Sequence, residues 1–168
     1  MAVSGRALAL LDGEVREGFR LTCSVTPTTD CIFAFDYPSS VLAGARPQVR
    51  RASVTGIDWP AKSVARLEIE LEDSSDFTFE SGKYVRIRVP GTDAWRSYSM
   101  ATTTKVLPKM QFLIRHIAGG AMSAWLRTAC AVGNQIEIDG PMGSFGLVET
   151  KGPQIMVAGG TGLAPMLA

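Results

Sequence analysis

Apolar and polar residues alternate along several stretches in the middle of the chain. In residues 63–71, Leu67, Ile69 and Leu71 share one face of an extended strand, and acidic residues occupy the other. Residues 84–89 repeat this two-residue period. Similar stretches predict further strands at 96–100, 111–116 and 135–139. Short strands separated by turn residues predict a small antiparallel barrel.

One helix interrupts these strands. Met122, Trp125, Leu126 and Ala129 recur at helical spacing, so they predict one buried face. Ser123 is the expected N-cap residue, because its hydroxyl can accept a bond from a free backbone N–H. The helix is expected to cap the barrel.

The two ends of the chain have a different character. Residues 19–25 and 31–35 predict two short strands, followed by a Pro- and Gly-containing linker. Residues 154–158 form a continuous apolar run of the kind buried in a parallel sheet, and glycines follow at once. Neither end is long enough to form a domain, so both are expected to be parts of neighbouring domains.

Composition narrows the function classes. The 168 residues are 46% hydrophobic and 20% charged, which is ordinary for a globular protein. The formal net charge of +1 does not favour a nucleic-acid partner. No apolar run approaches the ~18 residues of a membrane span, and no signal-peptide pattern is evident, so we expect a cytoplasmic protein. Three cysteines do not indicate a disulfide framework.

The stretch Arg96-Ser97-Tyr98-Ser99 carries the most chemistry. On a strand, Arg96 and Tyr98 share a face at a separation of roughly 6.6 Å. Tyr98 can lie flat against a ring, Arg96 can bind a phosphate, and Ser99 can bond to a ring nitrogen. The alternative is an exposed arginine beside a core tyrosine.

A glycine turn between a strand and the helix is the second candidate. Residues 115–123 bring Gly119 and Gly120 to the expected start of the helix, where free amides can bind an anion. An ordinary strand-to-helix turn explains the pattern equally well. His116, the one histidine, is more consistent with a surface or hydrogen-bonded residue than with a catalytic base.

Four motifs occur in a fixed order along the chain. They are Arg-x-Tyr-Ser at 96–99, Gly-x-Met-Ser at 120–123, Gly-Pro-x-Gly-x-Phe at 140–145 and Gly-Gly-Thr-Gly-x-Ala-Pro at 159–165. This order resembles the ferredoxin–NADP reductase superfamily. Residues 17–31 are similar to the end of a plant-type 2Fe–2S ferredoxin domain. The whole chain thus resembles the reductase components of bacterial aromatic-ring dioxygenases, of the benzoate and anthranilate type.

The resemblance implies roles for individual residues. Arg96 would bind the FAD pyrophosphate, Tyr98 would stack on the isoalloxazine, and Ser99 would lie beside the reactive nitrogen, with Ser97 in the same motif. The remaining implied contacts are Ile114 and Arg115 with FAD, Gly120, Met122 and Ser123 with the pyrophosphate, Gly160, Thr161 and Gly162 with NAD(P), and Cys23 with the cluster.

The resemblance also implies an organisation. It gives a mainly β fold, with a six-stranded antiparallel flavin-binding barrel at residues 46–151 and one capping helix. Residues 1–45 would be the remnant of the ferredoxin domain and its linker, and residues 152–168 the start of an α/β nicotinamide domain. The parent enzyme would pass electrons from NAD(P)H through FAD to a 2Fe–2S cluster and a terminal oxygenase or its ferredoxin.

The cysteines depart from the family pattern. Plant-type clusters use C-x4-C-x2-C before the last ligand, and no cysteine precedes Cys23. We therefore expect this stretch of chain to bind FAD but neither to hold a cluster nor to turn over NAD(P)H.

Other functions remain open from the sequence. The oxygenase could be a monooxygenase or hydroxylase, because a reductase does not contact the oxygenase substrate. A cofactor-free barrel could instead bind a protein partner or an oligonucleotide. A purely structural fragment with exposed apolar edges is the third alternative.

Overall fold

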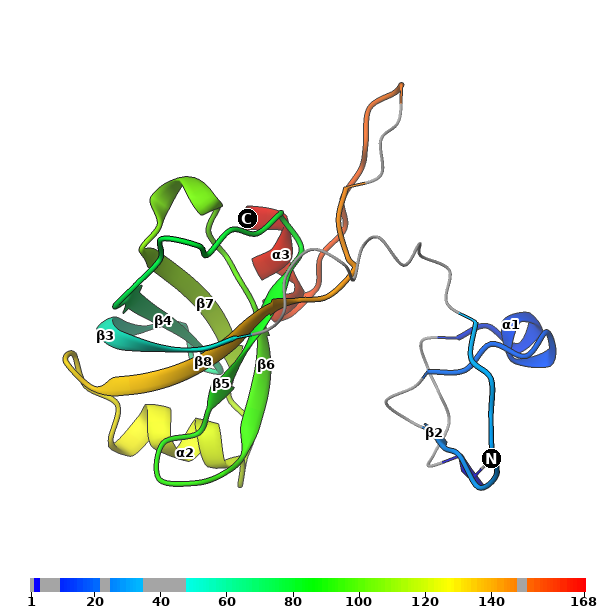
Figure 1. The fold of residues 1–168 in the computed structure, drawn as a ribbon, viewed down its shortest axis with the longest axis horizontal. Coiled ribbons are helices and arrows are strands. Elements are labelled where there is room, and N and C mark those ends of the chain that lie inside the picture. Colours follow the sequence, from blue (N-terminus) through cyan, green and yellow to red (C-terminus); the bar gives the residue numbers. More distant parts are fainter. Residues whose placement is uncertain (1, 4–9, 22–24, 35–47, 148–150) are drawn as a thin grey trace. The chain divides into compact units, whose positions relative to one another are not determined.

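The computed structural model describes residues 2–3, 10–21, 25–34, 48–147 and 151–168 (Figure 1). Contacts between residues divide the chain into two units, residues 1–36 and residues 37–168.

Six antiparallel strands form the larger unit. They are β3 (Gln48–Ala61), β4 (Val64–Leu71), β5 (Tyr84–Arg88), β6 (Trp95–Ser99), β7 (Lys109–Arg115) and β8 (Gln135–Met142). Their order in the sheet is β6-β5-β8-β3-β4-β7. A single bridge between Met100 and Phe112 brings the two edge strands together and closes the sheet into a barrel. The predicted six-stranded antiparallel barrel is confirmed.

Alternation along the strands places the core inside the barrel. In β4 every second residue is buried, which leaves Ala65, Leu67, Ile69 and Leu71 inside. β5 and β7 follow the same period. This is the two-residue period from which the strands were predicted, because one face of each strand must leave water.

β3 is the strand that the sequence pattern did not predict. It is 14 residues long and pairs with β8 through its first half and with β4 through its second. Only Ala52 and Val54 are fully buried along it. Two register shifts bend it, and at Gly56 an added Cβ would lie 2.7 Å from a Glu68 oxygen. Bulges of this kind disrupt the alternation on which the prediction relied.

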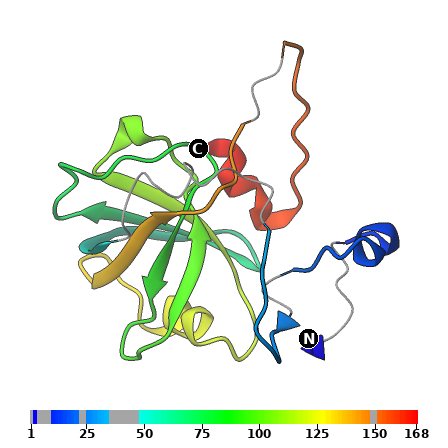
Figure 2. The ribbon, with the colours of Figure 1, turned by 45° about the vertical axis from the view of Figure 1, so that its right-hand side comes forward.

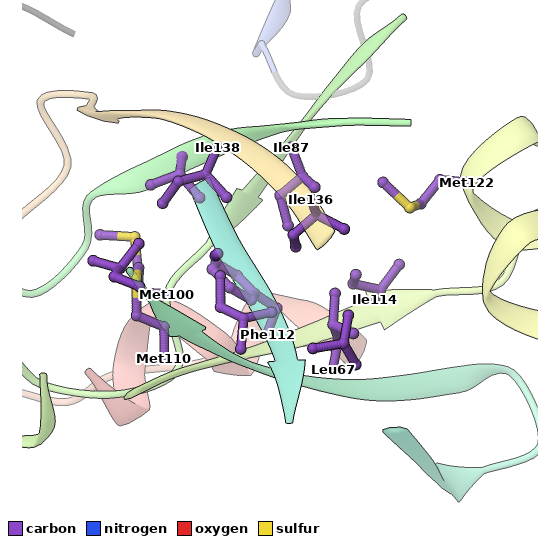
Figure 3. Close-up of a cluster of buried hydrophobic side chains, with 14 of the residues drawn as sticks. Leu67, Ile87, Met100, Met110, Phe112, Ile114, Met122, Ile136 and Ile138 are labelled. Atoms are coloured by element: carbon purple, nitrogen blue, oxygen red, sulfur yellow. The ribbon is translucent and has the colours of Figure 1, made fainter. Parts of the chain in front are cut away.

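Helix α2 (Ala121–Thr128) covers one end of the barrel (Figures 1 and 2). Met122 and Leu126 are buried on its inner face, as predicted. Figure 3 shows Met122 pointing toward Ile114 and Ile136 of the strands. Trp125 and Cys130 pack against the same core from the margin. The predicted capping helix is therefore present.

The loop between β4 and β5 supplies two further core rings. Phe77 and Phe79 are buried and meet edge to face, with ring centroids 5.9 Å apart. Arg50 lies over the Phe77 ring and forms a 2.7 Å ion pair with Asp76. This loop thereby packs into the barrel. A short 3-10 helix, η3 (Thr104–Val106), lies between β6 and β7.

The smaller unit differs from the prediction. Strands were expected at 19–25 and 31–35, but residues 19–21 and 31–34 form no strand. The strands present are two-residue segments, β1 (Ala2–Val3) and β2 (Val25–Thr26), which pair with each other. A five-residue helix, α1 (Asp12–Arg16), was not predicted. Apolar side chains do not make a strand unless another strand pairs with it along its length.

The last segment also differs from the prediction. Residues 154–158 form no strand, and Ile155 is 91% exposed and Val157 85% exposed. A strand of a parallel sheet needs another strand to pair with and cover on its two faces, and the described strands of this chain do not pair with this segment. After this segment come η4 (Gly160–Leu163) and the short helix α3 (Ala164–Leu167). No helix in the described part of the chain has the length and apolar character needed to cross a membrane.

Candidate functional site

Strand β6 is fully paired along one edge and, among the described residues, almost unpaired along the other. On one side, all five residues of β6 pair with β5. On the other side, the pairing between β6 and β7 in the described residues is the single bridge from Met100 to Phe112. We call the part of these two facing edges beyond that bridge, residues 95–99 and 113–115, the open seam.

Backbone hydrogen bonds show which residues face the open seam. The Met100 N–H donates to Lys83 on the β5 side, whereas the Ala101 N–H donates to Gln111 of β7 at 2.8 Å. Because backbone groups alternate sides along a strand, those of Ser97 and Ser99 are directed toward β7. On β7, the His116 N–H donates to Ser63 next to β4. The same alternation therefore directs Leu113 and Arg115 toward the seam.

Tyr98 and Arg96 share one face of β6, as predicted, and it is the inner face. Tyr98 stands opposite Val85 and Arg96 stands opposite Ile87; both of these partners are fully buried, and directly opposed residues share a face. Tyr98 is half-buried and packs against the core, whereas Arg96 is exposed. Burial raises the pKa of the Tyr98 phenol to about 12, and the nearby positive charge of Arg96 acts in the opposite direction.

These two side chains offer two kinds of contact at one place. The Tyr98 ring presents a partly desolvated flat surface. The Arg96 guanidinium donates to the Trp95 carbonyl at 2.9 Å and is not ion-paired among the described residues. A planar ring with an attached phosphate matches this pair of groups.

A tight turn connects the end of β7 to α2. The Gly120 N–H donates to the Ile117 carbonyl at 3.0 Å, and Gly119 has a φ of +73°, which favours glycine. Gly120 is the N-cap residue of α2. The first amides of the helix therefore follow the turn directly and are not used within the helix. We call residues 117–123 the phosphate turn, because this is the place predicted to bind an anion.

Ser123 does not occupy the predicted position. It was expected to cap the helix, but it lies two residues inside it and is 5% exposed. Its Oγ accepts the Ile117 N–H at 2.9 Å, so it closes the phosphate turn from within. Sequence spacing alone could not distinguish the two positions, because Gly120 has no side chain to mark the cap.

A third glycine-containing segment lies against the start of β5. At Gly82, an added Cβ would approach the Phe145 carbonyl to 2.5 Å, and at Gly143 it would approach the Tyr84 ring to 2.9 Å. The Lys83 ammonium donates to the Gly143 carbonyl at 2.7 Å. Residues 143–146, which follow β8, therefore pack closely against the start of β5.

The remaining predicted residues are placed as follows. Ile114 and Met122 have buried side chains, so each can offer only backbone groups to a ligand, and those of Ile114 point toward β4. Gly160, Thr161 and Gly162 lie in η4, which contacts β7. Cys23 lies outside the described residues. No set of three or more His, Cys, Asp or Glu side chains among the described residues is placed to hold a metal ion.

A hollow of about 490 Å³ lies elsewhere on the barrel. It is lined by residues of the β5–β6 hairpin, of β8 and of β3, and by none of the predicted site residues. Its two arginines are already engaged: Arg88 with Glu137 and Asp93, and Arg51 with Glu72. Because these guanidinium groups are already paired with carboxylates, the hollow is a poor site for an anionic ligand.

Two residues near the site escaped sequence reasoning. Lys83 bonds to the Gly143 carbonyl after β8, and Trp59 of β3 contacts His116 directly after β7. Neither residue belongs to a motif or to a periodic pattern in the sequence. Trp59 could have been found only by predicting β3 and its pairing, and Lys83 only by predicting how residues 143–146 pack against the start of β5.

The fold and the seam together define a class of protein. A six-stranded antiparallel barrel with one capping helix carries an aromatic side chain and an arginine on β6 and a glycine turn directly after β7, and these are the two strands whose edges form the open seam. The sequence profile of the oxidoreductase FAD-binding domain matches residues 53–147, which is more than half of the chain. The chain belongs to this family.

Similar proteins agree with this assignment. The chain is 34% identical over 160 residues to a toluate 1,2-dioxygenase electron transfer component of Pseudomonas putida, covering 95% of this chain and 47% of that protein. It is 35% identical over 161 residues to a propane 2-monooxygenase reductase component of Rhodococcus jostii, covering 94% and 43%. It thus spans about half the length of these relatives.

Solved structures share the fold. The Amycolatopsis cytochrome P450 reductase matches with a TM-score of 0.67 and 33% identity, over 72% of this chain and 37% of that one. Phthalate dioxygenase reductase matches with a TM-score of 0.63 and 22% identity, over 71% and 37%. The family match favours the flavin barrel over the cofactor-free barrel that the sequence had left open.

Proposed function

We propose that this chain is the FAD-binding part of a reductase that passes electrons from NAD(P)H through FAD toward a 2Fe–2S cluster and an oxygenase. One observation carries the proposal: within a barrel of the FAD-binding family, Tyr98 and Arg96 share the inner face of β6 beside the open seam.

The residues at the seam fit the parts of FAD. Tyr98 would lie against the flavin ring, and Ser99 and Arg115 would offer backbone groups to its polar edge. Arg96 and the first amides of α2, at Met122 and Ser123, would hold the pyrophosphate, and Gly120, which has no side chain, would let it approach the backbone. Ser97 contributes backbone groups to the same edge, and Ser123 supports the turn.

The bound flavin would accept a hydride and release single electrons, which is chemistry that protein side chains cannot supply. The chain's own residues position and shield it. The Tyr98 ring excludes water from one face, and Arg96 keeps positive charge near the phosphates. In this proposal Gly160, Thr161 and Gly162 would begin the NAD(P) site.

The cysteines of this chain do not fit a 2Fe–2S cluster. Cys31 is exposed, and Cys130 lies beside the core of the other unit, where burial raises its pKa to about 11. A cluster needs four thiolates from closely spaced cysteines. In the proposed enzyme the cluster would be held by other cysteines together with Cys23, and no electron-transfer step is assigned to this chain through it.

Relatives named as dioxygenase and monooxygenase components match about equally well. We propose a terminal oxygenase, or its ferredoxin, as the electron acceptor, and a cytoplasmic location for the enzyme. Nothing in the barrel distinguishes the two kinds of oxygenase.

Titration of the purified chain with FAD tests the proposal. Flavin fluorescence or absorbance gives the dissociation constant. Arg96→Ala should weaken binding roughly ten- to a hundred-fold, because it removes a charge-assisted bond to phosphate. Arg66→Ala is the matched control: Arg66 is an exposed barrel arginine bonded to Asp58. It should change the dissociation constant less than about two-fold.

Two variants of Tyr98 separate stacking from hydrogen bonding. Tyr98→Phe keeps the ring and should keep FAD, whereas Tyr98→Ala should weaken binding roughly ten-fold or more. A folded chain that binds no FAD, or one in which Arg96→Ala and Arg66→Ala behave alike, would contradict the proposed site.

A further inference from the structure

Three side chains from separate elements stack on the flank of the barrel beside the phosphate turn. Arg127 comes from the last turn of α2, Trp59 from β3, and His116 from the residue directly after β7. We call these three residues the brace. The FAD-binding residues proposed above do not include any of them.

The contacts within the brace are close. The Arg127 guanidinium carbon lies 4.0 Å from the centroid of the Trp59 ring, which is cation–π geometry. Its Nη2 also donates to the Lys62 carbonyl at 2.9 Å, in the turn between β3 and β4. Trp59 meets His116 edge to face, with ring centroids 6.1 Å apart.

The brace thus joins α2 to the β3–β4 hairpin. The inner face of α2 is held to the barrel by apolar contacts of Met122, Trp125 and Leu126, which are not directional. The guanidinium adds a directional bond to the hairpin backbone and a flat contact to Trp59.

The brace also holds the chain just before the phosphate turn, through His116. His116 is the residue before Ile117, where the turn begins, and its own N–H is bonded to Ser63 of the hairpin at 2.8 Å. Ile117 and Gly120 then form the turn, which Ser123 closes with its Oγ. The turn and the helix that follows it are therefore anchored to one hairpin, through His116 before the turn and Arg127 in the last turn of α2.

We propose that Arg127 and Trp59 are positioning residues for flavin phosphate binding: they hold the phosphate turn in the conformation that presents its amides to the pyrophosphate. This inference rests on the proposed function, but it concerns residues that do not contact the ligand. It explains why an exposed arginine is fixed at two points, a backbone carbonyl and an aromatic ring, at an entropic cost.

Two readouts on the 168-residue chain test the brace. Amide hydrogen exchange of the peptide spanning 116–124 reports the turn without any ligand, and FAD titration reports its consequence. Arg127→Ala should speed exchange in this peptide alone and raise the FAD dissociation constant roughly five- to ten-fold. Arg66→Ala, on the same hairpin, is the control and should change neither.

Conservative variants complete the design. Trp59→Phe keeps an aromatic face and should keep most FAD affinity, whereas Trp59→Ala should behave like Arg127→Ala. Thermal unfolding of each variant shows whether the chain is still folded. Arg127→Lys, which keeps the charge but not the planar fork, should recover part of the affinity.

The outcomes are distinct. Faster exchange at the turn together with weaker FAD binding supports the brace. Weaker FAD binding with unchanged exchange would mean that Arg127 touches the ligand, which contradicts a positioning role. If Arg127→Ala matches Arg66→Ala in both readouts, the inference is wrong. A parent chain that binds no FAD would refute the proposed function, and exchange alone would then decide whether the brace orders the turn.

Discussion

The barrel contains two very different junctions between neighbouring strands. Between β3 and β8, residues 48–53 pair continuously with residues 135–140. Between β6 and β7, the described pairing is one bridge at Met100 and Phe112. The continuous junction satisfies backbone groups with each other, whereas the strand pairing at the open seam stops before Ser97, whose backbone groups can bond to another partner. Binding capacity in this barrel thus lies where strand pairing stops.

The difference extends to the side chains. Beneath the β3–β8 junction the inner residues, such as Ile136 and Ile138, are buried and apolar. On the inner face of β6, the order from the bridge outward is Met100, Tyr98 and Arg96, with exposure rising at each step. The strand thus passes from core to site along one face, which lets a rigid strand hold the proposed ligand contacts.

The largest expected loss of stability comes from a substitution at the Met100–Phe112 bridge, and it tests whether this bridge is part of the hydrophobic core. Phe112 is fully buried under the bridge, whereas its neighbour Leu113 is only partly buried and on the other face. Phe112→Ala should lower the free energy of unfolding by about 3–5 kcal/mol, and Leu113→Ala by about 1 kcal/mol. Urea unfolding followed by circular dichroism measures both. Equal losses of stability would show that the outer face of β7 is packed as tightly as its inner face.

The next largest loss of stability is expected where the segment after β8 packs against the start of β5. Gly82 and Gly91 both have positive φ, +94° and +76°, but only at Gly82 would a Cβ collide with the chain, at the Phe145 carbonyl. Gly91→Ala should cost about 1 kcal/mol for backbone strain alone. Gly82→Ala should cost about 2–3 kcal/mol, because residues 143–146 must also move. Thermal unfolding of the two variants measures both losses of stability. Equal losses would show that the segment after β8 is not held against β5.

The smallest effect is a pH dependence at the seam. Burial raises the pKa of Tyr98 to about 12, above the ordinary value of 10.0. Folding therefore favours the neutral phenol, so this contribution is fully present below about pH 10 and is lost as the pH rises toward 12. The ring is only half-buried, so solvent screening limits the change to about 1 kcal/mol.

Urea unfolding at about pH 9 and about pH 11 measures this contribution. The parent chain should lose more stability over this interval than Tyr98→Phe, which has no phenol to ionise. Identical losses would indicate that Tyr98 is as solvated as a free tyrosine and that the seam is open to water on both faces.

Sequence reasoning predicted the regular parts of the barrel and not the irregular ones. β4, β5 and β7 alternate strictly, so their period was visible in the sequence. β3 was missed because its bends at Gly56 and after Asp58 interrupt the period. The strands expected at the two ends of the chain were wrong, because an apolar run becomes a strand only when another strand pairs with it.

The site shows the same limit. The shared face of Arg96 and Tyr98 follows from strand geometry and was predicted correctly. Ser123 was assigned to the cap because it is the residue type that caps helices, but the helix begins after Gly120. The brace was beyond prediction, since Trp59, His116 and Arg127 meet only through the register of an unpredicted strand. Long-range pairing, rather than local propensity, decides these contacts.

The most direct test of the account is to map the FAD contacts by nuclear magnetic resonance on the isotope-labelled chain. We predict that FAD shifts the backbone amides along the open seam and in the phosphate turn, while the β3–β8 junction stays unchanged. The amides expected to shift are those of Ser97, Ser99, Leu113, Arg115 and Gly120 to Ser123. Shifts centred instead on the hollow around Arg88 and Gly91, with the seam unaffected, would contradict the claim that the break in strand pairing is the flavin site.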